Sequence, residues 1–497
     1  MRVTLASRRS DLARIQAYQV GDALRLSHPQ IEINYSFHQS LGDKNQDDPL
    51  WQMPEKGVFT QDFRKGILAG EFDLVVHSWK DLAIEDDRET EVIATLPRAD
   101  ARDLLLVPSK RWPQVERTGV MSVLTSSPRR AYNLDSFLRD ALPANLSKLN
   151  FISVRGNVPT RVRKLLQLDV DGLIVAKAAM DRLLEAPQAE FAATQRELRE
   201  ALLQCRWMVL PLRENPSAPA QGALAIEIAR RREDIRELLA PLNCPHTFAA
   251  VLSERRILES YGGGCHQKIG ASVLRRPFGE ITFVRGLTDN AQVLDRCTLA
   301  PPTPRPPKIS RDEMWPLSPS DADWFVRESV PASPPRRSVA LWIAKADALP
   351  DHWNIQPGQT VWASGVQTWK RLTRRGVWVN GCAESLGEHE SPAIETLVGT
   401  AVDWLKLTHE SGYTDGDMPA LSTYKLVPKN GAVNLSGKKY FFWKSGSLFE
   451  YGLARNRWLK NMTHFCGPGN TQRILERNGV QPHIFLDQAQ WLKEMSE

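Results

Sequence analysis

The sequence has few of the features that mark secreted, membrane-spanning or metal-binding proteins. Its 497 residues include six cysteines, scattered at 205, 244, 265, 297, 382 and 466, and none forms Cys-x-x-Cys. This spacing suggests neither a zinc site nor a dithiol motif, so we expect no bound metal. No run of about 18 apolar residues exists, so we expect no transmembrane helix. The first nine residues lack the apolar core of a signal peptide, which predicts a cytoplasmic protein with reduced thiols.

An excess of either charge is also missing. The formal net charge is +6, with 25% charged and 42% hydrophobic residues, which is typical of a globular protein. Such a balance does not by itself favour nucleic acid or a membrane surface as a partner. The basic segments contain few aromatic residues that could stack on bases, so we expect neither partner.

The first 300 residues do contain a regular alternation of short apolar runs and amphipathic helical patterns. This alternation predicts an α/β fold with a largely parallel sheet. The expected elements are strands at Val3–Ala6, Ile31–Phe37, Leu74–His77, Asn150–Val154 and Gly172–Ala176, and helices at Leu12–Arg25 and Phe63–Ala69. A smaller α+β unit is expected from strands near Ala223–Ile228, Ile281–Val284 and Val293–Leu299, with helices near Asp234–Leu239 and Phe248–Ser260.

Prolines interrupt this pattern after residue 300. Residues 301–337 contain Pro-Pro-Thr-Pro-Arg-Pro-Pro and Pro-Ala-Ser-Pro-Pro-Arg-Arg. Proline at this density blocks helices and removes strand donors, so we predict a semi-rigid linker over 301–338. A separate α/β domain is expected over 339–497.

That last domain carries a faint internal repeat. Thr368, Leu372, Gly376 and Val377 recur as Thr471, Leu475, Gly479 and Val480. Gly365 precedes the first copy, and Gly467 and Gly469 stand just ahead of the second. Each copy indicates a strand, a glycine turn, a helix capped by threonine and a glycine at the helix end. Coincidence remains an alternative, because few positions match.

One strand end is notable for its charges. The apolar run Leu74–His77 is followed by Ser78, Trp79, Lys80 and Asp81, so a cation and an anion are adjacent. The carboxyl edge of an open α/β sheet faces the ligand crevice. A Lys–Asp pair there could hold an acidic ligand and stabilise a cation forming on it. The alternative is a solvated strand end with a chance charge pair.

Arginines follow four of the expected strands. In Thr125–Arg130, three hydroxyl residues and a proline precede two arginines, Arg129 and Arg130. In Arg155–Arg161, a glycine turn leads into the start of a helix. Free N–H groups at helix starts, combined with guanidinium forks, favour carboxylates or phosphates. Arg8 and Arg182 follow two further strands. The alternative is a set of solvated helix faces.

A glycine-rich loop carries one of the cysteines. Gly262, Gly263 and Gly264 precede Cys265, so a flexible backbone could bring this thiol into a crevice. The thiol could act as a nucleophile or hold a covalent cofactor. The alternative is a glycine hinge with an incidental cysteine. A second turn, Lys56–Thr60, fits either a ligand-facing loop or an ordinary surface turn.

Together these segments resemble hydroxymethylbilane synthase, also called porphobilinogen deaminase. The family's motifs occur in order over about residues 1–300, as Arg8–Ala13, His77–Asp81, Thr125–Arg130, Arg155–Arg161, Ala220–Ala223 and Gly263–Cys265. The resemblance implies two cleft-forming, periplasmic-binding-protein-like α/β domains and a small α+β domain that bears the cysteine. The expected boundaries are 1–100 with 205–222, then 101–204, then 223–300. We expect a monomer.

The resemblance also implies a reaction. The family condenses four porphobilinogen units head to tail with loss of ammonia, on a covalent dipyrromethane cofactor attached to the loop cysteine, here Cys265. Asp81 matches the catalytic carboxylate, and Lys80 and Arg8 complete the catalytic set. Cofactor-binding positions match Cys265, Ser10, Lys80, Asp81, Thr125, Ser126, Ser127, Arg129, Arg130 and Arg155. Substrate-binding positions match Arg8, Phe59, Arg155, Arg161 and Arg182. Each pyrrole carries two carboxylates, so several arginine-bearing strand ends suit the growing chain.

Several residues depart from the family pattern. They are Asp11 and Ala83 where proline is usual, Pro128 for leucine, Ala220 for glycine, and His266–Lys268 after the cysteine. None removes a charged group that the chemistry needs, but each affects the geometry of a loop.

The C-terminal domain resembles uroporphyrinogen-III synthase over roughly residues 339–497. The repeat, Ser422–Tyr424, Lys444–Gly446 and Gly467–Thr471 carry this likeness, with Tyr424 and Thr471 as candidate site residues. The resemblance implies closure of the linear tetrapyrrole with inversion of its last ring. A non-catalytic, structural domain is the alternative, as is a chain that only binds anions.

Overall fold

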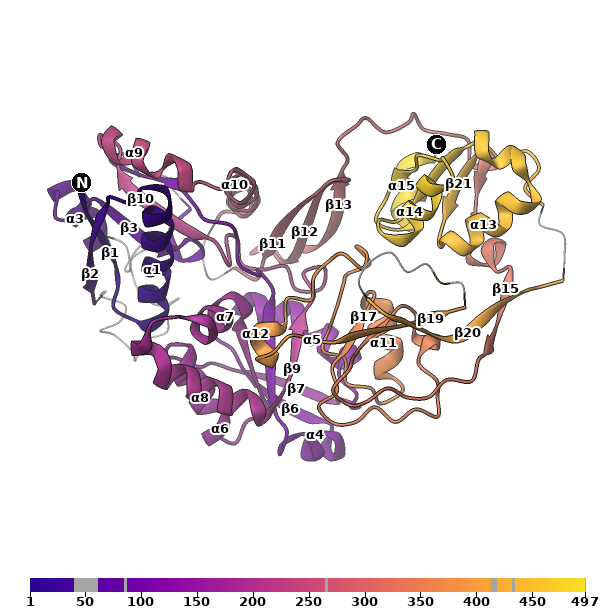
Figure 1. Cartoon of the computed structure of the whole chain (residues 1–497), viewed down its shortest axis with the longest axis horizontal. Coiled ribbons are helices and arrows are strands. Elements are labelled where there is room, and N and C mark those ends of the chain that lie inside the picture. Colours follow the sequence, from indigo (N-terminus) through magenta and orange to yellow (C-terminus); the bar gives the residue numbers. More distant parts are fainter. Residues whose placement is uncertain are drawn as a thin grey trace. The chain divides into compact units, whose positions relative to one another are not determined.

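The chain folds into two compact units, shown as a ribbon in Figure 1. This computed structural model describes residues 1–39, 61–84, 87–263, 267–410, 412, 418–430 and 434–496. The first unit comprises Met1–Arg139, Ala144–Arg275 and Thr282–Cys297, and the second comprises Asp140–Pro143, Arg276–Ile281 and Thr298–Glu497. No helix in the described part of the chain is long and apolar enough to span a membrane.

The first sheet of the first unit has the strand order β2-β1-β3-β10-β4. Its strands are β1 (Arg2–Arg8), β2 (Glu32–His38), β3 (Leu74–Ser78), β4 (Thr90–Ala94) and β10 (Leu224–Ala229). Its helices are α1 (Asp11–Ser27), α3 (Gln61–Ala69) and α9 (Glu233–Leu239). The apolar face of α1, with Val20 and Leu24, packs on buried Val3 and Leu5 of β1. The predicted strands and helices of this region are confirmed, with ends shifted by a few residues.

The second sheet has the order β7-β6-β8-β5-β9. Its strands are β5 (Asp103–Pro108), β6 (Val120–Leu124), β7 (Lys148–Ile152), β8 (Gly172–Ala176) and β9 (Cys205–Leu210). Its helices are α4 (Trp112–Thr118), α5 (Pro128–Ala141), α6 (Val158–Gln167), α7 (Lys177–Glu185) and α8 (Ala192–Leu203). Strand β5 is buried along its whole length, because it lies between β8 and β9.

The chain passes between the two sheets twice, and this corrects two predictions. Strand β9 pairs with β5, so residues 205–210 belong to the second sheet. They were predicted to belong to the first domain. Strand β10 pairs antiparallel with β3 and β4 in the first sheet, although it was assigned to the third domain. Strand β5 is also antiparallel to β8 and β9, so the prediction of a largely parallel sheet was wrong in part. Local periodicity shows that a strand exists but not which distant strand it pairs with.

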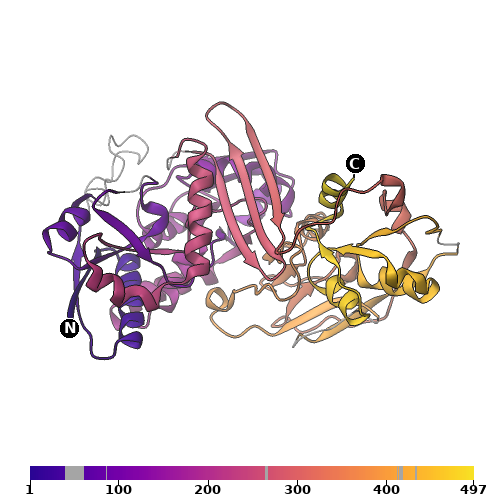
Figure 2. The same cartoon turned by 90° about the horizontal axis from the view of Figure 1, so that it is seen from above.

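A third group consists of α10 (Pro245–Glu259) and a sheet in the order β11-β12-β13. The strands are β11 (Gly270–Arg276), β12 (Gly279–Leu287) and β13 (Val293–Ala300). Figure 2 shows the helix lying beside this sheet. Leu258, Ile269, Val284 and Leu294 form the core between them. This group confirms the expected helix near Phe248–Ser260 and the strands near Ile281–Val284 and Val293–Leu299, whereas α9, like β10, packs with the first sheet.

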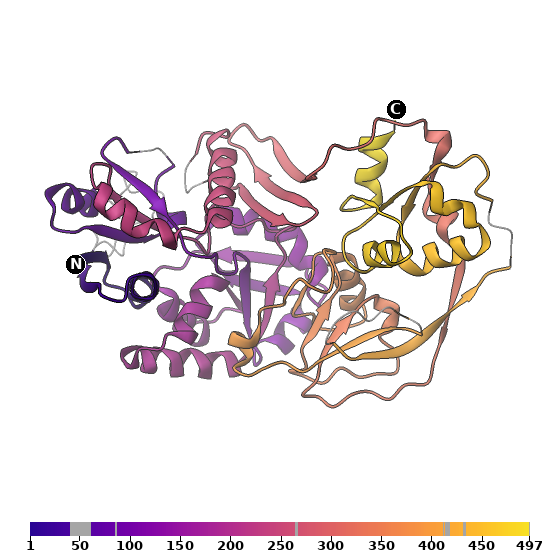
Figure 3. The ribbon, with the colours of Figure 1, turned by 45° about the horizontal axis from the view of Figure 1, so that its top comes forward.

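The second unit contains two further sheets, seen in orange and yellow in Figure 3. Their orders are β15-β20-β19-β16-β17-β18 and β14-β21-β22-β23. The strands of the first are β15 (Phe325–Ser329), β16 (Ala340–Ile343), β17 (Val361–Ala363), β18 (Gly381–Cys382), β19 (Trp404–His409) and β20 (Ala420–Pro428). Those of the second are β14 (Met314–Trp315), β21 (Tyr440–Trp443), β22 (Thr463–Cys466) and β23 (His483–Ile484). The helices are α11 (Val366–Thr373), α12 (Glu395–Val398), α13 (Gly446–Arg455), α14 (Asn470–Arg477) and α15 (Gln488–Met495).

Two predictions for this unit need correction. The linker predicted over 301–338 contains β14 and β15, which pair with β21 and β20, so much of it belongs to the folded unit. Short strands fit between the prolines because each pairs along one edge only. The repeat is confirmed as strand, turn and helix, with Gly376 and Gly479 in the left-handed region at the helix ends. Its predicted threonine caps are wrong, because the N-cap residues are Gly365 and Gly469.

Candidate active site

The charged pair predicted at the end of β3 lies on a short helical turn, Trp79–Asp81. The Trp79 amide donates to the Ala223 carbonyl oxygen at 3.1 Å, and its buried ring lies edge-on to Phe248 with centroids 5.1 Å apart. This anchored tryptophan fixes the two residues that follow. Asp81 is exposed, whereas Lys80 is partly buried.

Lys80 lies within a cluster of opposite charges. Burial lowers the pKa of Lys80, the carboxylates of Asp81 and Asp103 oppose this effect, and Arg130 and Arg129 add to it. Its Nζ donates to Gln221 Oε1 at 3.5 Å. The structure therefore brings Lys80 and Asp81 of the first sheet next to the predicted arginines of the second.

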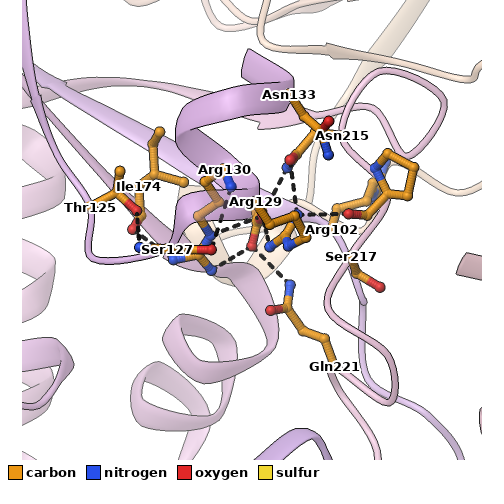
Figure 4. A network of polar contacts seen from close by, with 12 residues as sticks. Arg102, Thr125, Ser127, Arg129, Arg130, Asn133, Ile174, Asn215, Ser217 and Gln221 are labelled. Carbon is orange, nitrogen blue, oxygen red and sulfur yellow. Dashed lines mark hydrogen bonds and ion pairs between the residues drawn. The ribbon is translucent and has the colours of Figure 1, made fainter. Parts of the chain in front are cut away.

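Arg129 and Arg130 are both buried and both bind Asp103, the first residue of β5. Asp103 accepts from Arg129 Nη2 at 2.8 Å, from Arg130 Nη2 at 2.6 Å and from Arg130 Nε at 3.0 Å. Asn215 Nδ2 and Gln221 Nε2 add two further hydrogen bonds, each of 2.8 Å. In Figure 4 the side chains of Arg129, Arg130, Asn215 and Gln221 converge from separate parts of the chain. Although burial alone would raise the pKa of Asp103, the two guanidinium groups lower it strongly, so this group is a carboxylate.

The predicted hydroxyl turn follows β6 and leads into α5, which begins at Pro128 as expected. Thr125 Oγ1 accepts from the Ser127 amide at 3.2 Å, and Ser127 Oγ accepts from the Arg130 amide at 3.4 Å. Ser126 Oγ donates to the Val154 carbonyl oxygen at 2.5 Å and accepts from its amide at 3.0 Å. These bonds join the turn to the start of α6, so both arginine-bearing segments are held at one edge of the sheet.

Arg155 and Arg161 flank the start of α6. Asn157 caps this helix by accepting from the Thr160 amide at 3.0 Å, and Arg161 Nε donates to the Gly156 carbonyl oxygen at 2.8 Å. Burial lowers the pKa of Arg161 to about 10, Arg130 and Arg155 act in the same direction, and Asp81 opposes them. Arg161 is therefore within electrostatic range of Asp81, as the predicted site requires.

The remaining described candidates of this unit lie on both sheets. Ser10 caps α1 by accepting from the Ala13 amide at 3.4 Å, and Arg8 ends β1 with its side chain partly exposed. Arg182 is buried on α7, and its Nη2 donates to the Gly222 carbonyl oxygen at 2.8 Å. Arg182 is thus bonded to the second crossover, and no contact with Asp81 or Lys80 is recorded for it among the described residues.

Phe59, Cys265 and the turn Lys56–Thr60 lie outside the described residues, but the base of the cysteine loop is described. A Cβ placed on Gly263 would lie 3.3 Å from Ile84 Cδ1, three residues after Asp81. Arg255 of α10 donates to the carbonyl oxygens of Leu82, at 3.3 Å, and of Ala83. The loop that carries Cys265 therefore starts beside the turn that carries Asp81.

Sequence reasoning missed three polar groups that connect these segments, Asp103, Gln221 and Glu254. Asp103 begins an apolar run that gave no sign of a functional residue. Gln221 was included only as a member of the motif Ala220–Ala223. Glu254 of α10, which is fully buried, binds the Arg98 fork at 2.7 and 2.9 Å and accepts from the Ala220 amide at 2.8 Å. Ala220, where the family usually has glycine, has a φ of 66°, in the left-handed region that favours glycine. Nothing in the local sequence gives these partners, which are far apart along the chain.

In the second unit, Tyr424 and Thr471 lie on β20 and at the start of α14. Burial raises the pKa of Tyr424, and Arg327 opposes it. The Tyr424 ring is 5.7 Å from that of His409, and His409 Nε2 shares a 2.9 Å hydrogen bond with Ser447 Oγ of α13. This bond links the carboxyl end of β19, in the six-stranded sheet, to the first turn of α13, which follows β21 of the four-stranded sheet.

A cationic cluster near Tyr424 was not predicted. Lys345 follows β16, and burial lowers the pKa of Lys345, with Arg327, Arg371 and Lys444 acting in the same direction. The carboxylate of Asp347 opposes their effect on Lys345, and it pairs with Arg327 at 3.2 Å and with Arg371. The cluster, defined as Arg327, Lys345, Arg371 and Lys444, has an excess of positive charge suited to an anion.

Comparison with known proteins points to a family. The family model for the porphobilinogen deaminase dipyromethane cofactor binding domain matches residues 3–237. A porphobilinogen deaminase from Syntrophomonas wolfei subsp. wolfei is 33% identical over 284 residues, which cover 57% of this chain and 83% of the relative. One from Acidothermus cellulolyticus is 36% identical over 314 residues, with 59% and 86% covered. The solved structure of YhfZ from Shigella flexneri matches at 13% identity over 52% of this chain and 91% of its own, with a TM-score of 0.26, which is too low to support an argument.

Proposed function

Since this chain belongs to the porphobilinogen deaminase family, we propose that it joins four porphobilinogen molecules head to tail to make hydroxymethylbilane. Ammonia leaves at each of these steps, and one water molecule then releases the finished tetrapyrrole from the cofactor and supplies its hydroxyl group. These steps belong to tetrapyrrole synthesis. The chain would therefore act as a transferase.

The cationic side chains around Lys80 fit the family's dipyrromethane, because this group carries two carboxylates on each ring. Lys80, Arg155 and Arg161 would hold these carboxylates, and Arg129 and Arg130 would add positive potential from their buried network with Asp103. Cys265 would form the thioether, since the base of its loop lies beside Ile84. Once bound, the dipyrromethane supplies the ring carbon to which the first substrate is joined.

The residues around Asp81 would perform the coupling. Loss of ammonia breaks the C–N bond of the substrate's aminomethyl group and leaves a cationic methylene carbon. The exposed Asp81 carboxylate stabilises this charge. Asp81 would then accept the proton that is released when the new C–C bond forms. Lys80 and Arg161 hold the acidic chain so that the reacting carbons meet.

The observation that carries this proposal is the placement of Asp81 within electrostatic range of Lys80 and Arg161, which come from opposite sheets. Asp81→Asn keeps the size of the side chain but removes its charge. We expect kcat for porphobilinogen consumption to fall by about 100-fold or more, as when one electrostatic group is lost from an active site.

Asp169→Asn is the matched control for this test, because its side chain is 85% exposed and pairs only with Arg111 in the described contacts. It should retain normal turnover. Full activity of Asp81→Asn would rule out the role given to Asp81. A wild-type chain that binds porphobilinogen without consuming it would favour a protein that binds anions without catalysis.

For the second unit we propose a uroporphyrinogen-III-synthase-like role, closing hydroxymethylbilane into uroporphyrinogen III. The specific support is the cationic cluster beside Tyr424, near the carboxyl ends of β16 and β21. In open α/β sheets this edge is where ligands bind. The cluster would hold the carboxylates of the linear tetrapyrrole, and Tyr424 and Thr471 would contact its reacting end.

Product analysis of the full-length chain tests this second role. Removing the charges in Lys345→Ala/Arg371→Ala should shift the product from the III isomer toward the I isomer. Lys439→Ala, at a side chain 60% exposed, should leave the isomer ratio unchanged. A wild-type chain that makes only the I isomer would favour a structural, non-catalytic domain.

A further inference from the structure

Gln221 occupies the second crossover between the sheets, on the segment that joins β9 to β10. Its side chain is buried, with 1% exposed. Nε2 donates to the Ala101 carbonyl oxygen at 2.7 Å and to Asp103 Oδ1 at 2.8 Å. Both amide hydrogens therefore have acceptors from the start of the second sheet. A flipped amide would place its oxygen against these two oxygens, so the network determines which way Gln221 points.

The orientation of Gln221 leaves its oxygen facing Lys80 across the junction of the two sheets. Lys80 Nζ donates to Gln221 Oε1 at 3.5 Å. The charged groups around Lys80 are Asp81 on its own turn, Asp103 on β5, and Arg129 and Arg130 on α5. Two of these charges attract the ammonium group and two repel it, while burial disfavours it. A fixed neutral acceptor stabilises the ammonium form without changing the net charge of the site.

We propose that Gln221 is a positioning residue that keeps Lys80 protonated and directed beside Asp81, with Asp103 as its anchor. The proposal rests on the proposed function only in taking Lys80 as a group that holds carboxylates. It assigns the Asp103 network a second task. Besides binding Arg129 and Arg130, Asp103 fixes the amide that reaches Lys80 in the other sheet.

The pKa of Lys80 measured directly in the loaded protein tests this proposal. Competitive acetylation over a pH series, followed by peptide mass spectrometry, reports the pKa of one amine. Gln221→Met removes the acceptor and keeps a long unbranched side chain. Because the ammonium form loses a partner, we expect the pKa of Lys80 to fall by about 0.5 to 1. The alkaline limb of kcat should move to lower pH by the same amount.

Asn215→Leu is the matched control, since Asn215 also donates to Asp103 at 2.8 Å but does not contact Lys80. It should leave the pKa of Lys80 unchanged. Gln221→Asn is a second variant, in which the amide is too short to reach both Asp103 and Lys80, and it should also lower this pKa. Intact mass and thermal unfolding establish that each variant is loaded and folded.

An unchanged pKa of Lys80 in folded Gln221→Met or Gln221→Asn would overturn the proposal, as would an equal shift in Asn215→Leu. This result is independent of the proposed function. Absence of porphobilinogen turnover in the wild-type chain would reject that function, while the acetylation profile of Lys80 would still report on Gln221.

Discussion

Several buried side chains of the first unit keep their charge where burial alone would remove it. Asp103 accepts five hydrogen bonds, two of which come from the Arg130 fork. The two carboxylates of Asp81 and Asp103 cannot neutralise all three cations, Arg129, Arg130 and Lys80, so the region keeps an excess of positive charge. A site for a polycarboxylate needs that excess, held in place before the ligand arrives.

Glu227 of β10 is a buried carboxylate whose stabilising effect depends on pH. It accepts from Arg64 Nε at 2.8 Å, from Thr90 Oγ1 at 2.6 Å, and lies 3.0 Å from His77 Nε2. Burial alone would raise the pKa of Glu227, but His77, Thr90 and Arg64 lower it from 4.5 to about 2. Its contribution to stability is therefore complete above pH 4.5 and is lost as the pH falls toward 2.

Glu227→Gln should lower the free energy of unfolding by about 3 kcal/mol at pH 7, as a pKa difference of this size implies. The difference from wild type should shrink as the pH falls to 2. Urea unfolding of both proteins at pH 7, 4 and 2.5 measures this. A difference that stays constant over this range would show that the charge of Glu227 is not what stabilises the fold.

The secondary structure could be predicted where its period is visible in the sequence. Strand β1 and helix α1 were predicted because their apolar residues repeat at strand and helix spacing and meet in one core. Pairing could not be predicted, so β9 and β10 were given to the wrong domains. Proline density concealed β14 and β15, whose partners lie 95 to 126 residues later, from Ser329–Tyr424 to Met314–Tyr440.

The candidate site was predictable in its charges but not in its connections. Lys80, Asp81 and Arg161 were predicted from strand ends, and the structure brings them together. Asp103 and Gln221 were missed because they are 118 residues apart. Arg129 and Arg130 were predicted as ligands of the cofactor, whereas the structure binds both to Asp103. Their direct contact with the cofactor stays a prediction.

Glu254 connects α10 to both crossovers and to β11. Besides Arg98 and the Ala220 amide, it accepts from the Val273 amide at 2.8 Å. Glu254→Gln removes the charge that compensates the Arg98 fork. We expect a loss of about 3 to 5 kcal/mol in the free energy of unfolding, because a buried cation loses its partner.

Glu259→Gln, at an exposed position on the same helix, is the control for this change and should cost less than about 0.5 kcal/mol. Chemical denaturation of the two variants gives the comparison. Equal effects would show that Glu254 does not hold these elements together.

The whole chain combines two units that each bury a core of their own. The first contains the residues matched by the family model except Asp140–Pro143, and the second has cores around Trp443 and around Trp491. Each unit also has a cationic region near strand ends, around Lys80 in the first and around Lys345 in the second. Two such regions in one chain suit successive steps on the same polycarboxylate, which is the arrangement proposed here.

We propose that Cys265 carries the two-pyrrole group on which the product grows. The intact mass of the freshly purified full-length protein, followed by peptide mapping, tests it most directly. We expect a mass increase equal to one dipyrromethane, located on the Cys265 peptide, absent in Cys265→Ser and retained in Cys297→Ser. An unmodified Cys265 in protein that still consumes porphobilinogen would contradict the account.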